Sequence, residues 1–398
     1  MLAITKDLLG TENHLLQQDP TGPLTWSRSV PPNFLSLGPV RDSISIEAAF
    51  EIFKMQCPTP VPEEFQNAMK AIGTNETVIP WHLVIPQEKY LSSLKDTFEI
   101  LWKLFSKLCQ SSYLQTYIRV SNFINCMQKA RIDSVKLSNY IAAENNPSVL
   151  STLKSFKSCD DGLTQKVHYS NCRTVTGRLT VRAGPRILTL PANCRDIIGS
   201  YYEGGQILEL DFKSLEPRIA LILAGKDPPC DVYNEISEKL FSNKLKRPEV
   251  KIAVLCALYG ASTRKLDSML DNKFSGYEVI KQIKEYFCYN DITTKLSHDY
   301  KRDGLISNAF GRPIFCDSDR GNILYSNFVQ STAVDAAILG FKKLLDTMIS
   351  DLKDVRPLFL VHDALILDIK HNNWMKHDIS FVEVDNVGKL YFDQTRVT

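Results

Sequence analysis

Two aspartates, Asp211 and Asp363, each follow a short apolar run, and this placement suggests a site for two divalent metal ions. The runs are ILEL at 207–210 and LFLVH at 358–362. Runs of this kind predict buried strands, and an acid at the tip of such a strand reaches the rim of its sheet. Carboxylate oxygens are the ligands that Mg²⁺ prefers. We therefore expect the two acids to bind metal together.

A helical ridge of cationic and aromatic side chains lies between these acids in the sequence. Arg247, Lys251, Leu255 and Tyr259 recur every four residues along an apolar stretch that closes with Gly260. Residues four apart share one face of a helix, so two cations lie together toward the start of this ridge. Acids for metal and cations for phosphate indicate phosphoryl transfer from a nucleoside triphosphate.

Length and composition are typical of a soluble chain with more than one subdomain. The chain has 398 residues, which exceeds the usual single core, so two or three subdomains are expected. No run of about 18 uncharged apolar residues and no signal peptide are found, which predicts an intracellular, cytoplasmic protein without a membrane partner. The ten cysteines form no CxxC pair, which argues against structural zinc and against a disulfide scaffold.

The charge pattern leaves two interpretations open. The net charge of +2 does not by itself indicate a nucleic-acid partner. Residues 154–186 nevertheless carry seven cations against two acids, a stripe that could neutralise phosphates or could simply face water. The cations of this basic stripe are Lys154, Lys157, Lys166, Arg173, Arg178, Arg182 and Arg186.

The elements that must position these residues follow from proline content and periodicity. Residues 1–87 are rich in proline and are expected to be irregular with short helices. Residues 88–165 predict helical material, because apolar residues recur there at helical spacing. The first of them are Leu91, Leu94, Phe98, Leu101, Phe105 and Leu108. Strand and turn signals dominate 166–225, a helical block spans 226–305, and 306–398 combines strands with one long helix.

Five motifs occur in a fixed order along the chain. They are VTGRLT at 175–180, LDFKSLEPR at 210–218, RPEVKIAVLCALYG at 247–260, FVQSTAVDAA at 328–337 and LVHDALIL at 360–367. In this order and spacing they resemble the palm and fingers motifs of family A DNA polymerases, the family of bacterial DNA polymerase I and of some phage replicases. The resemblance covers about residues 166–369 and is weaker before them.

The resemblance implies an α+β fold of the right-hand polymerase type. The antiparallel palm sheet would come from 166–225 and 306–398, the helical fingers from 226–305, and the helical thumb from 88–165. Residues 1–87 would form a separate N-terminal segment. This segment contains no strand with an acid-x-acid pattern, and it is too short for a proofreading exonuclease domain.

The resemblance also implies a role for each residue around the metals. Asp211 and Asp363 match the two metal-binding aspartates, and the carbonyl of Phe212 would complete the coordination. The cofactor would be two Mg²⁺ ions, for which Mn²⁺ could substitute. Arg247 and Lys251 match the cations that bind the triphosphate, and Lys251 also counts among the catalytic residues.

Further matches concern the incoming nucleotide. Glu216 matches the acid that lies beneath the sugar and excludes a 2′-hydroxyl, which favours dNTPs. Tyr259 would end the ridge near the templating base. Leu255 stands where Phe or Tyr is usual, Tyr233 where a histidine often contacts phosphate, and Ala364 where a glutamate usually follows the second aspartate. These three departures affect the expected speed and accuracy.

The remaining matches concern DNA. Arg178 and Gln330 match residues that reach the minor groove near the primer end, where the acceptors on bases occupy similar positions in every correct pair. His362 would steady the primer terminus. The expected partners are a primed template DNA and dNTPs, and the protein is expected to act as a monomer.

The sequence therefore predicts a template-directed DNA polymerase that extends a primer 3′-hydroxyl without intrinsic proofreading. Two alternatives stay open. A single-subunit RNA polymerase would share the aspartates and the ridge, although Glu216 argues against it. A catalytically idle protein that binds primer and template is conceivable because of the departures, although the intact acids and cations argue against it.

Overall fold

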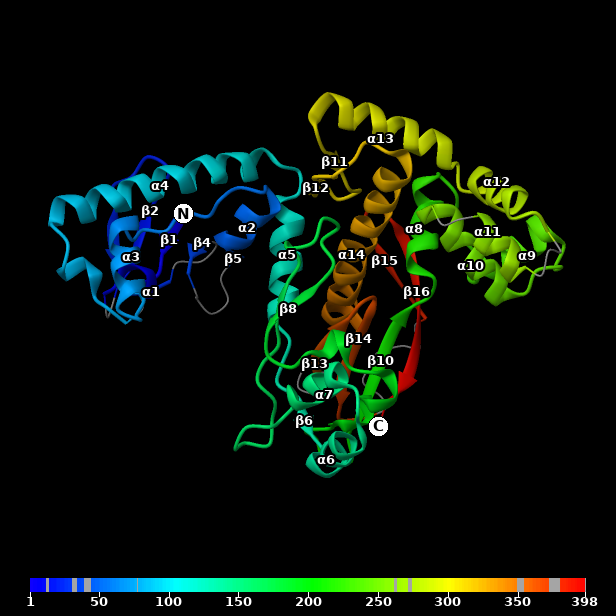
Figure 1. Ribbon diagram of the computed structural model, residues 1–398, viewed down its shortest axis with the longest axis horizontal. Coiled ribbons are helices and arrows are strands. Elements are labelled where there is room, and N and C mark those ends of the chain that lie inside the picture. Colours follow the sequence, from blue (N-terminus) through cyan, green and yellow to red (C-terminus); the bar gives the residue numbers. More distant parts are fainter. Residues whose placement is uncertain are drawn as a thin grey trace. The chain divides into compact units, whose positions relative to one another are not determined.

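The computed structural model describes residues 1–11, 14–30, 34–38, 44–76, 78–260, 263–270, 274–348, 354–371 and 380–397. The chain divides into two units, Met1–Asn122 and Phe123–Thr398, each with its own sheet (Figure 1). In the part of the chain that the structure describes, no helix combines the length and the apolar character that crossing a bilayer requires.

The first unit contains a five-stranded mixed sheet in the order β3-β2-β1-β4-β5. The central strand β1 pairs antiparallel with β2 and parallel with β4, while β3 extends the antiparallel side and β5 the parallel side. The strands are β1 (Leu2–Ile4), β2 (Leu15–Gln18), β3 (Thr25–Ser27), β4 (Leu35–Leu37) and β5 (Ile44–Ser45). The helices are α1 (Lys6–Leu9), α2 (Ile46–Ile52), α3 (Glu63–Ala71), the 3₁₀ helix η1 (Trp81–Leu83), α4 (Gln87–Gln110) and α5 (Leu114–Asn125), which crosses into the second unit.

This first unit is more regular than its prolines predict. All three residues of β1 and all three of β4 are buried, so burial does not alternate along these strands as it does along a half-buried strand. Strands of two to four residues are also too short for a periodicity to emerge. The short helices expected in 1–87 are present as α1, α2 and α3, whereas the expectation that the rest of this segment is irregular was wrong, because it contains a five-stranded sheet.

The helix α4 confirms the apolar spacing found after residue 88. Leu94, Phe98, Leu101 and Leu108 of the expected stripe are buried, whereas Leu91 is 44% exposed. Helix α4 contacts β1 and α2 of the first unit. The segment predicted as a thumb, 88–165, thus spans the division between the two units.

The second unit is built on an antiparallel sheet in the order β13-β14-β10-β16-β15, in agreement with the antiparallel sheet expected for 166–225 and 306–398 (Figure 1). Its strands are β10 (Gln206–Phe212), β13 (Val355–Val361), β14 (Ala364–Ile369), β15 (Phe381–Val384) and β16 (Gly388–Arg396). The strands β13 and β14 are almost wholly apolar, and the apolar residues of β10 are buried with them in the core of the second unit.

The long helix α14 (Gly321–Met348) packs against this sheet and against α8 (Leu215–Leu223). The rings of Phe212 and Phe341 lie 4.5 Å apart between the helix and the sheet. Gly340 makes this close approach possible, since a Cβ there would lie 3.0 Å from the Phe212 ring and 3.3 Å from Val382. Helix packing thus fixes the strand that carries Asp211.

Helices fill the segment predicted as fingers, 226–305. They are α9 (Val232–Phe241), α10 (Arg247–Tyr259), α11 (Thr263–Met269), α12 (Gly276–Tyr286) and α13 (Tyr289–Asp303). Helix α10 contacts α9, α12 and α14. These contacts hold α10 against α14, the helix that packs on the sheet.

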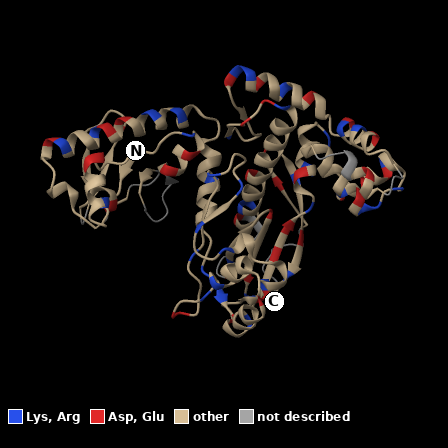
Figure 2. Ribbon diagram, in the orientation of Figure 1, with Lys and Arg blue, Asp and Glu red and all other residues tan. Residues whose placement is uncertain are grey.

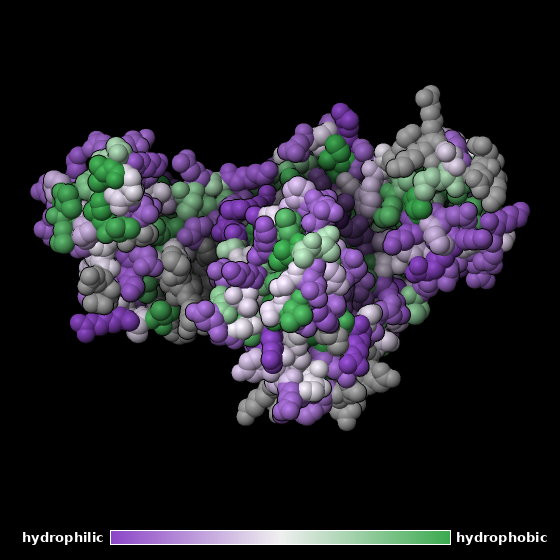
Figure 3. All heavy atoms as spheres, turned by 60° about the horizontal axis from the view of Figure 1, so that its bottom comes forward, coloured by the Kyte–Doolittle hydropathy of each residue, from purple (hydrophilic) through white to green (hydrophobic). Residues whose placement is uncertain are grey.

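Short elements complete the second unit. They are β6 (Arg131–Ile132), α6 (Ser134–Ala143), α7 (Pro147–Lys154), β7 (His168–Ser170), β8 (Thr180–Ala183), η2 (Ile187–Thr189), η3 (Ala192–Ile197), β9 (Ile198–Gly199), β11 (Ile306–Ser307) and β12 (Pro313–Ile314). On the face shown in Figure 3, hydrophilic residues predominate and apolar residues form separate patches. Figure 2 shows Lys and Arg gathered along the segment that includes β8, where most cations of the basic stripe are exposed.

Candidate active site

The two predicted metal ligands lie side by side at one end of the central strands of the sheet. Asp211 on β10 is the direct cross-strand partner of Ala364, the first residue of β14. Asp363 belongs to the tight turn between β13 and β14, and its carbonyl accepts a hydrogen bond of 3.3 Å from the Phe212 N–H. The turn requires a left-handed backbone at His362, whose φ is 57°. Asp211 and Asp363 are 152 residues apart in the sequence (363 minus 211), and the local fold brings them together.

The surroundings of the two acids disfavour two negative charges. Burial among protein atoms, together with the nearby Asp363, raises the pKa of Asp211 to about 7. Burial also raises the pKa of Asp363. A cation placed between the carboxylates would relieve both effects, because it favours the charged form of each acid.

The donor set fits a hard divalent metal ion. Among the described residues, neither carboxylate forms an ion pair or accepts a hydrogen bond from another side chain, so their oxygens remain available to a cation. No group of three or more His, Cys, Asp or Glu side chains with metal-binding geometry occurs in the described part of the chain. Further ligands would therefore have to be backbone carbonyls, water or substrate oxygens, which is the usual pattern for Mg²⁺.

A cleft of about 630 Å³ adjoins the acids and gathers most of the predicted site residues. Residues from β10, α8, α9, α10, β16 and the β13–β14 turn line it. The predicted residues in its lining are Asp211, Phe212, Glu216, Tyr233, Arg247, Lys251, Leu255 and Asp363. Its lining also contains Lys213, Asp231 and Asp393, which the sequence did not single out.

The expected helical ridge is present on α10. This helix spans Arg247–Tyr259, and Gly260 ends it with φ 82° while donating its N–H to the Cys256 carbonyl. A Cβ at Gly260 would lie 2.8 Å from the Asn322 amide, so the turn also needs the missing side chain. Arg247, Lys251 and Leu255 of the ridge line the cleft, with the two cations exposed and Leu255 half-buried. Tyr259 is half-buried as well and lies outside this lining.

Arg247 is held in place by two residues from the start of α9. Its Nε donates a hydrogen bond of 2.8 Å to the Asp231 carboxylate, and its guanidinium lies 5.3 Å from the centre of the Tyr233 ring. Asp231 also caps α9 by accepting the N–H groups of Tyr233 and Asn234 at 3.1 and 3.2 Å. Burial opposes ionisation of Asp231, but the hydrogen bonds from Arg247 and the backbone lower its pKa on balance. The sequence reasoning missed Asp231 as the partner of Arg247. Its position directly before a helix, where an aspartate can act as a cap, was the signal that could have identified it.

Glu216 joins the ridge to Arg178 in the turn before β8. The Tyr259 hydroxyl donates a short hydrogen bond to Glu216 Oε2, and Arg178 Nη2 donates one of 2.7 Å to Glu216 Oε1. Burial and the neighbouring Glu216 charge raise the pKa of Tyr259, so this tyrosine stays protonated and acts as a donor at neutral pH. One carboxylate is thereby fixed at both oxygens.

A second cavity of about 170 Å³ lies on the other side of Glu216 and Asp363. Both acids line it together with Arg178 and His362, opposite apolar residues of α14. The apolar residues of its lining are Leu179, Leu188, Leu215, Ala333, Val334, Ala337 and Ile338. Of the predicted DNA contacts, Arg178 and His362 meet here, whereas Gln330 lines neither of these two cavities and is half-buried on α14.

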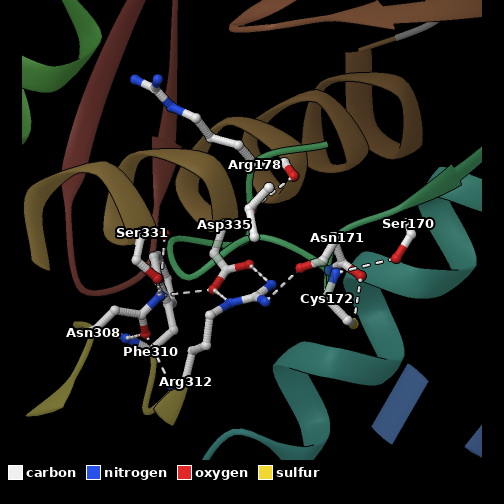
Figure 4. A network of polar contacts seen from close by, with 10 residues as sticks. Ser170, Asn171, Cys172, Arg178, Asn308, Phe310, Arg312, Ser331 and Asp335 are labelled. Atoms are coloured by element: carbon white, nitrogen blue, oxygen red, sulfur yellow. Dashed lines mark hydrogen bonds and ion pairs between the residues drawn. The ribbon is translucent and has the colours of Figure 1, made fainter. Parts of the chain in front are cut away.

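A buried ion pair supports the turn that carries Arg178. Arg312 and Asp335 are 3% and 0% exposed and are joined by two hydrogen bonds of 2.7 and 3.0 Å. Asn308 donates to Asp335 at 2.8 Å, and Arg312 donates to the Asn171 carbonyl at 2.8 Å. Figure 4 shows these residues below Arg178. In the sequence, only a turn signal near Gly311 marks this region, and no pattern reveals the network.

Comparisons with known proteins extend this description. No protein-family model matches the sequence, and no curated protein matches it. Among solved structures, the chain is similar to the POL domain of Pol1 from M. smegmatis in a complex with DNA primer-template and dNTP, with a TM-score of 0.56 and 14% identity. The match covers 89% of this chain and 81% of that chain. The protein thus has a mixed α/β fold similar to that of a polymerase domain.

Proposed function

We propose that the protein is a template-directed DNA polymerase of the right-hand type, with palm, fingers and thumb, that adds deoxynucleotides to a primer 3′-hydroxyl. The observation that carries this proposal is that one cleft contains the Asp211 and Asp363 pair, the α10 cations and the fixed Glu216 carboxylate. A fold similar to a polymerase domain supports it independently.

Asp211, Asp363 and the Phe212 carbonyl would hold two Mg²⁺ ions, or Mn²⁺ in their place. When bound, such ions supply Lewis acidity at the reacting phosphate and neutralise developing negative charge. In the reaction the primer hydroxyl oxygen bonds to the α-phosphorus, the bond from that phosphorus to the bridging oxygen breaks, and pyrophosphate leaves with its electron pair. The hydroxyl proton passes to solvent.

The α10 cations would bind the β- and γ-phosphates. Arg247 and Lys251 lie one helical turn apart near the N-terminus of α10, whose positive pole adds to their attraction for phosphate. Arg247 exchanges its contact with Asp231 for phosphate oxygens, and the Tyr233 ring continues to support its guanidinium. Both cations stabilise the charge that develops on the departing pyrophosphate.

Glu216 would select deoxyribose over ribose. Because Tyr259 and Arg178 hold both of its oxygens, its carboxylate cannot swing aside for a 2′-hydroxyl without losing a charge-assisted hydrogen bond. Arg178 and His362 line the second cavity beside Asp363, which supports a role at the primer end. Gln330 is proposed as a further minor-groove contact.

We also propose that synthesis proceeds without intrinsic proofreading. The described strands of the first unit, β1 to β5, carry no Asp or Glu, and a metal-dependent nuclease needs several carboxylates. A primer with a mismatched 3′ end should therefore stay intact when it is incubated with Mg²⁺ and without dNTPs. Shortening of that primer would contradict this part of the proposal.

One assay tests the central proposal. A labelled DNA primer on a DNA template is incubated with Mg²⁺ and either dNTPs or rNTPs, with the wild type beside Asp211→Asn and Asp363→Asn. We expect extension with dNTPs and a loss of about a thousandfold or more in each variant. Extension with rNTPs alone would indicate an RNA polymerase. Failure of the wild type to extend while it still binds the primer would indicate an idle binding protein.

A further inference from the structure

A third cation, Lys213, lies in the cleft and is paired with an acid. Its ammonium nitrogen lies 2.7 Å from the Asp393 carboxylate, and both residues belong to the lining. Lys213 lies within the LDFKSLEPR motif but has no role assigned by the resemblance, and Asp393 lies outside all five motifs.

Strand geometry fixes the side on which the pair lies. Asp393 on β16 is the direct cross-strand partner of Asp211, so the two carboxylates emerge on the same face of the sheet. Lys213 comes two residues after Asp211, and its N–H donates to the Tyr391 carbonyl at 2.8 Å, which extends the ladder. Successive side chains of an extended segment alternate, so Lys213 returns to the face of Asp211.

The exposure of the pair indicates that it can be exchanged. The Lys213 and Asp393 side chains are 34% and 64% exposed, whereas those of the buried Arg312–Asp335 pair are 3% and 0% exposed. An exposed ion pair contributes little to stability and breaks at small cost.

We propose that Lys213 is a further phosphate-binding residue, and that Asp393 holds its ammonium in the cleft and competes with the triphosphate for it. This inference rests on the proposed function. The ammonium would leave Asp393 and donate hydrogen bonds to phosphate oxygens on the side of the cleft opposite α10. Arg247 and Asp231 form an analogous pair on the α10 side, so two of the cleft's cations each have a carboxylate partner before nucleotide binds.

The competition predicts opposite effects for the two partners. Lys213→Met removes a charge-assisted contact and should raise the KM for dNTP about tenfold. Asp393→Asn removes the competitor and should lower that KM about threefold. The kcat should change less than the KM in both variants. A pair that merely stabilises the fold would shift the KM in the same direction in both variants.

The experiment combines single-nucleotide insertion kinetics with calorimetric titration of pyrophosphate into the protein at fixed Mg²⁺. Lys342→Met is the matched control, because Lys342 pairs with Asp346 on α14 and lines neither cavity. We expect weaker pyrophosphate binding in Lys213→Met, tighter binding in Asp393→Asn and no change in the control. Shifts in one direction for both variants, or none, would overturn the inference.

The titration keeps the inference separate from the proposed function. If the wild type extends primers and Arg247→Ala weakens binding while Lys213→Met does not, the role of Lys213 is wrong and the polymerase proposal stands. If the wild type extends no primer, the proposed function fails. The titration then still decides whether Lys213 binds phosphate.

Discussion

The Tyr259 hydroxyl donates a hydrogen bond to the Glu216 carboxylate, joining the last residue of α10 to the first turn of α8. The other Glu216 oxygen accepts from Arg178, so one side chain connects the ridge of α10 with the turn before β8. The position of this carboxylate therefore depends on two donors from distant parts of the chain.

Removal of one donor should weaken the selection of sugars. In Tyr259→Phe, Glu216 keeps only the Arg178 contact and can move away from a 2′-hydroxyl. We expect the ratio of kcat/KM for dNTP over rNTP to fall about tenfold, which corresponds to one charge-assisted hydrogen bond. Tyr286→Phe is the control, since Tyr286 donates to Glu235 at a site outside both cavities. An unchanged ratio in Tyr259→Phe would show that the bond does not position Glu216.

The raised pKa of Asp211 predicts a pH-dependent penalty in the metal-free protein. Its folded pKa of about 7 lies above the ordinary value of 3.8, so the folded state binds the proton more tightly than the unfolded state. This group therefore lowers stability as the pH rises from about 4 to about 7, and the penalty is complete above that range. Asp211→Asn should accordingly raise the melting temperature at pH 8 and change it little at pH 4.5. Both melting temperatures are measured in the presence of a chelator. An equal change in melting temperature at the two pH values would contradict this prediction.

Metal should act on stability through the same two acids. The proposed Mg²⁺ ions would bind only the folded arrangement of Asp211 and Asp363, so saturating Mg²⁺ should raise the melting temperature of the wild type at pH 8. The increase should be lost in Asp211→Asn and in Asp363→Asn, even though both variants start from a more stable metal-free state. Calorimetry with Ca²⁺ in place of Mg²⁺ separates binding from turnover. An undiminished increase in either variant would place the ion elsewhere.

Local patterns in the sequence predicted the parts of the site that lie within one element. The spacing of Arg247, Lys251 and Tyr259 depends only on helical geometry, and the structure contains that helix. The strand tips at Asp211 and Asp363 likewise follow from short apolar runs, and the sheet brings them together. Periodicity is sufficient here because every residue of such a motif belongs to one regular segment.

The pairs that hold these residues could not be predicted in this way. Arg312 and Asp335, and likewise Lys213 and Asp393, come from different elements, so no periodicity links their members. Such pairs depend on the register of neighbouring strands and on helix packing, which a single sequence does not encode locally. The short strands of the first unit were missed for a related reason, because two to four residues contain too little pattern.

The buried Arg312–Asp335 pair should be essential for stability. Arg312→Met leaves the Asp335 charge buried without its main partner, and we expect a loss of about 3–5 kcal/mol in the free energy of unfolding. Lys342→Met, which removes an exposed pair on the same helix as Asp335, should cost less than about 1 kcal/mol. Chemical denaturation of both variants measures the difference. Similar losses in the two variants would mean that the buried pair contributes no more than a surface pair.

Gly177 connects this buried pair to the turn that carries Arg178. Its φ is 77°, and a Cβ there would lie 2.7 Å from the Arg312 guanidinium carbon. Gly162 provides a matched control, because its φ is 73° and a Cβ there meets nothing within 4 Å. Gly162→Ala should therefore cost only the backbone strain of about 1–2 kcal/mol. Gly177→Ala should cost about 1–3 kcal/mol more, because the methyl group must displace Arg312 from its hydrogen bonds with Asp335 and Asn171. Gly177→Ala should also weaken primer binding, because the next residue, Arg178, is a proposed contact at the primer end. Equal losses of stability in the two alanine variants would show that Arg312 does not support this turn.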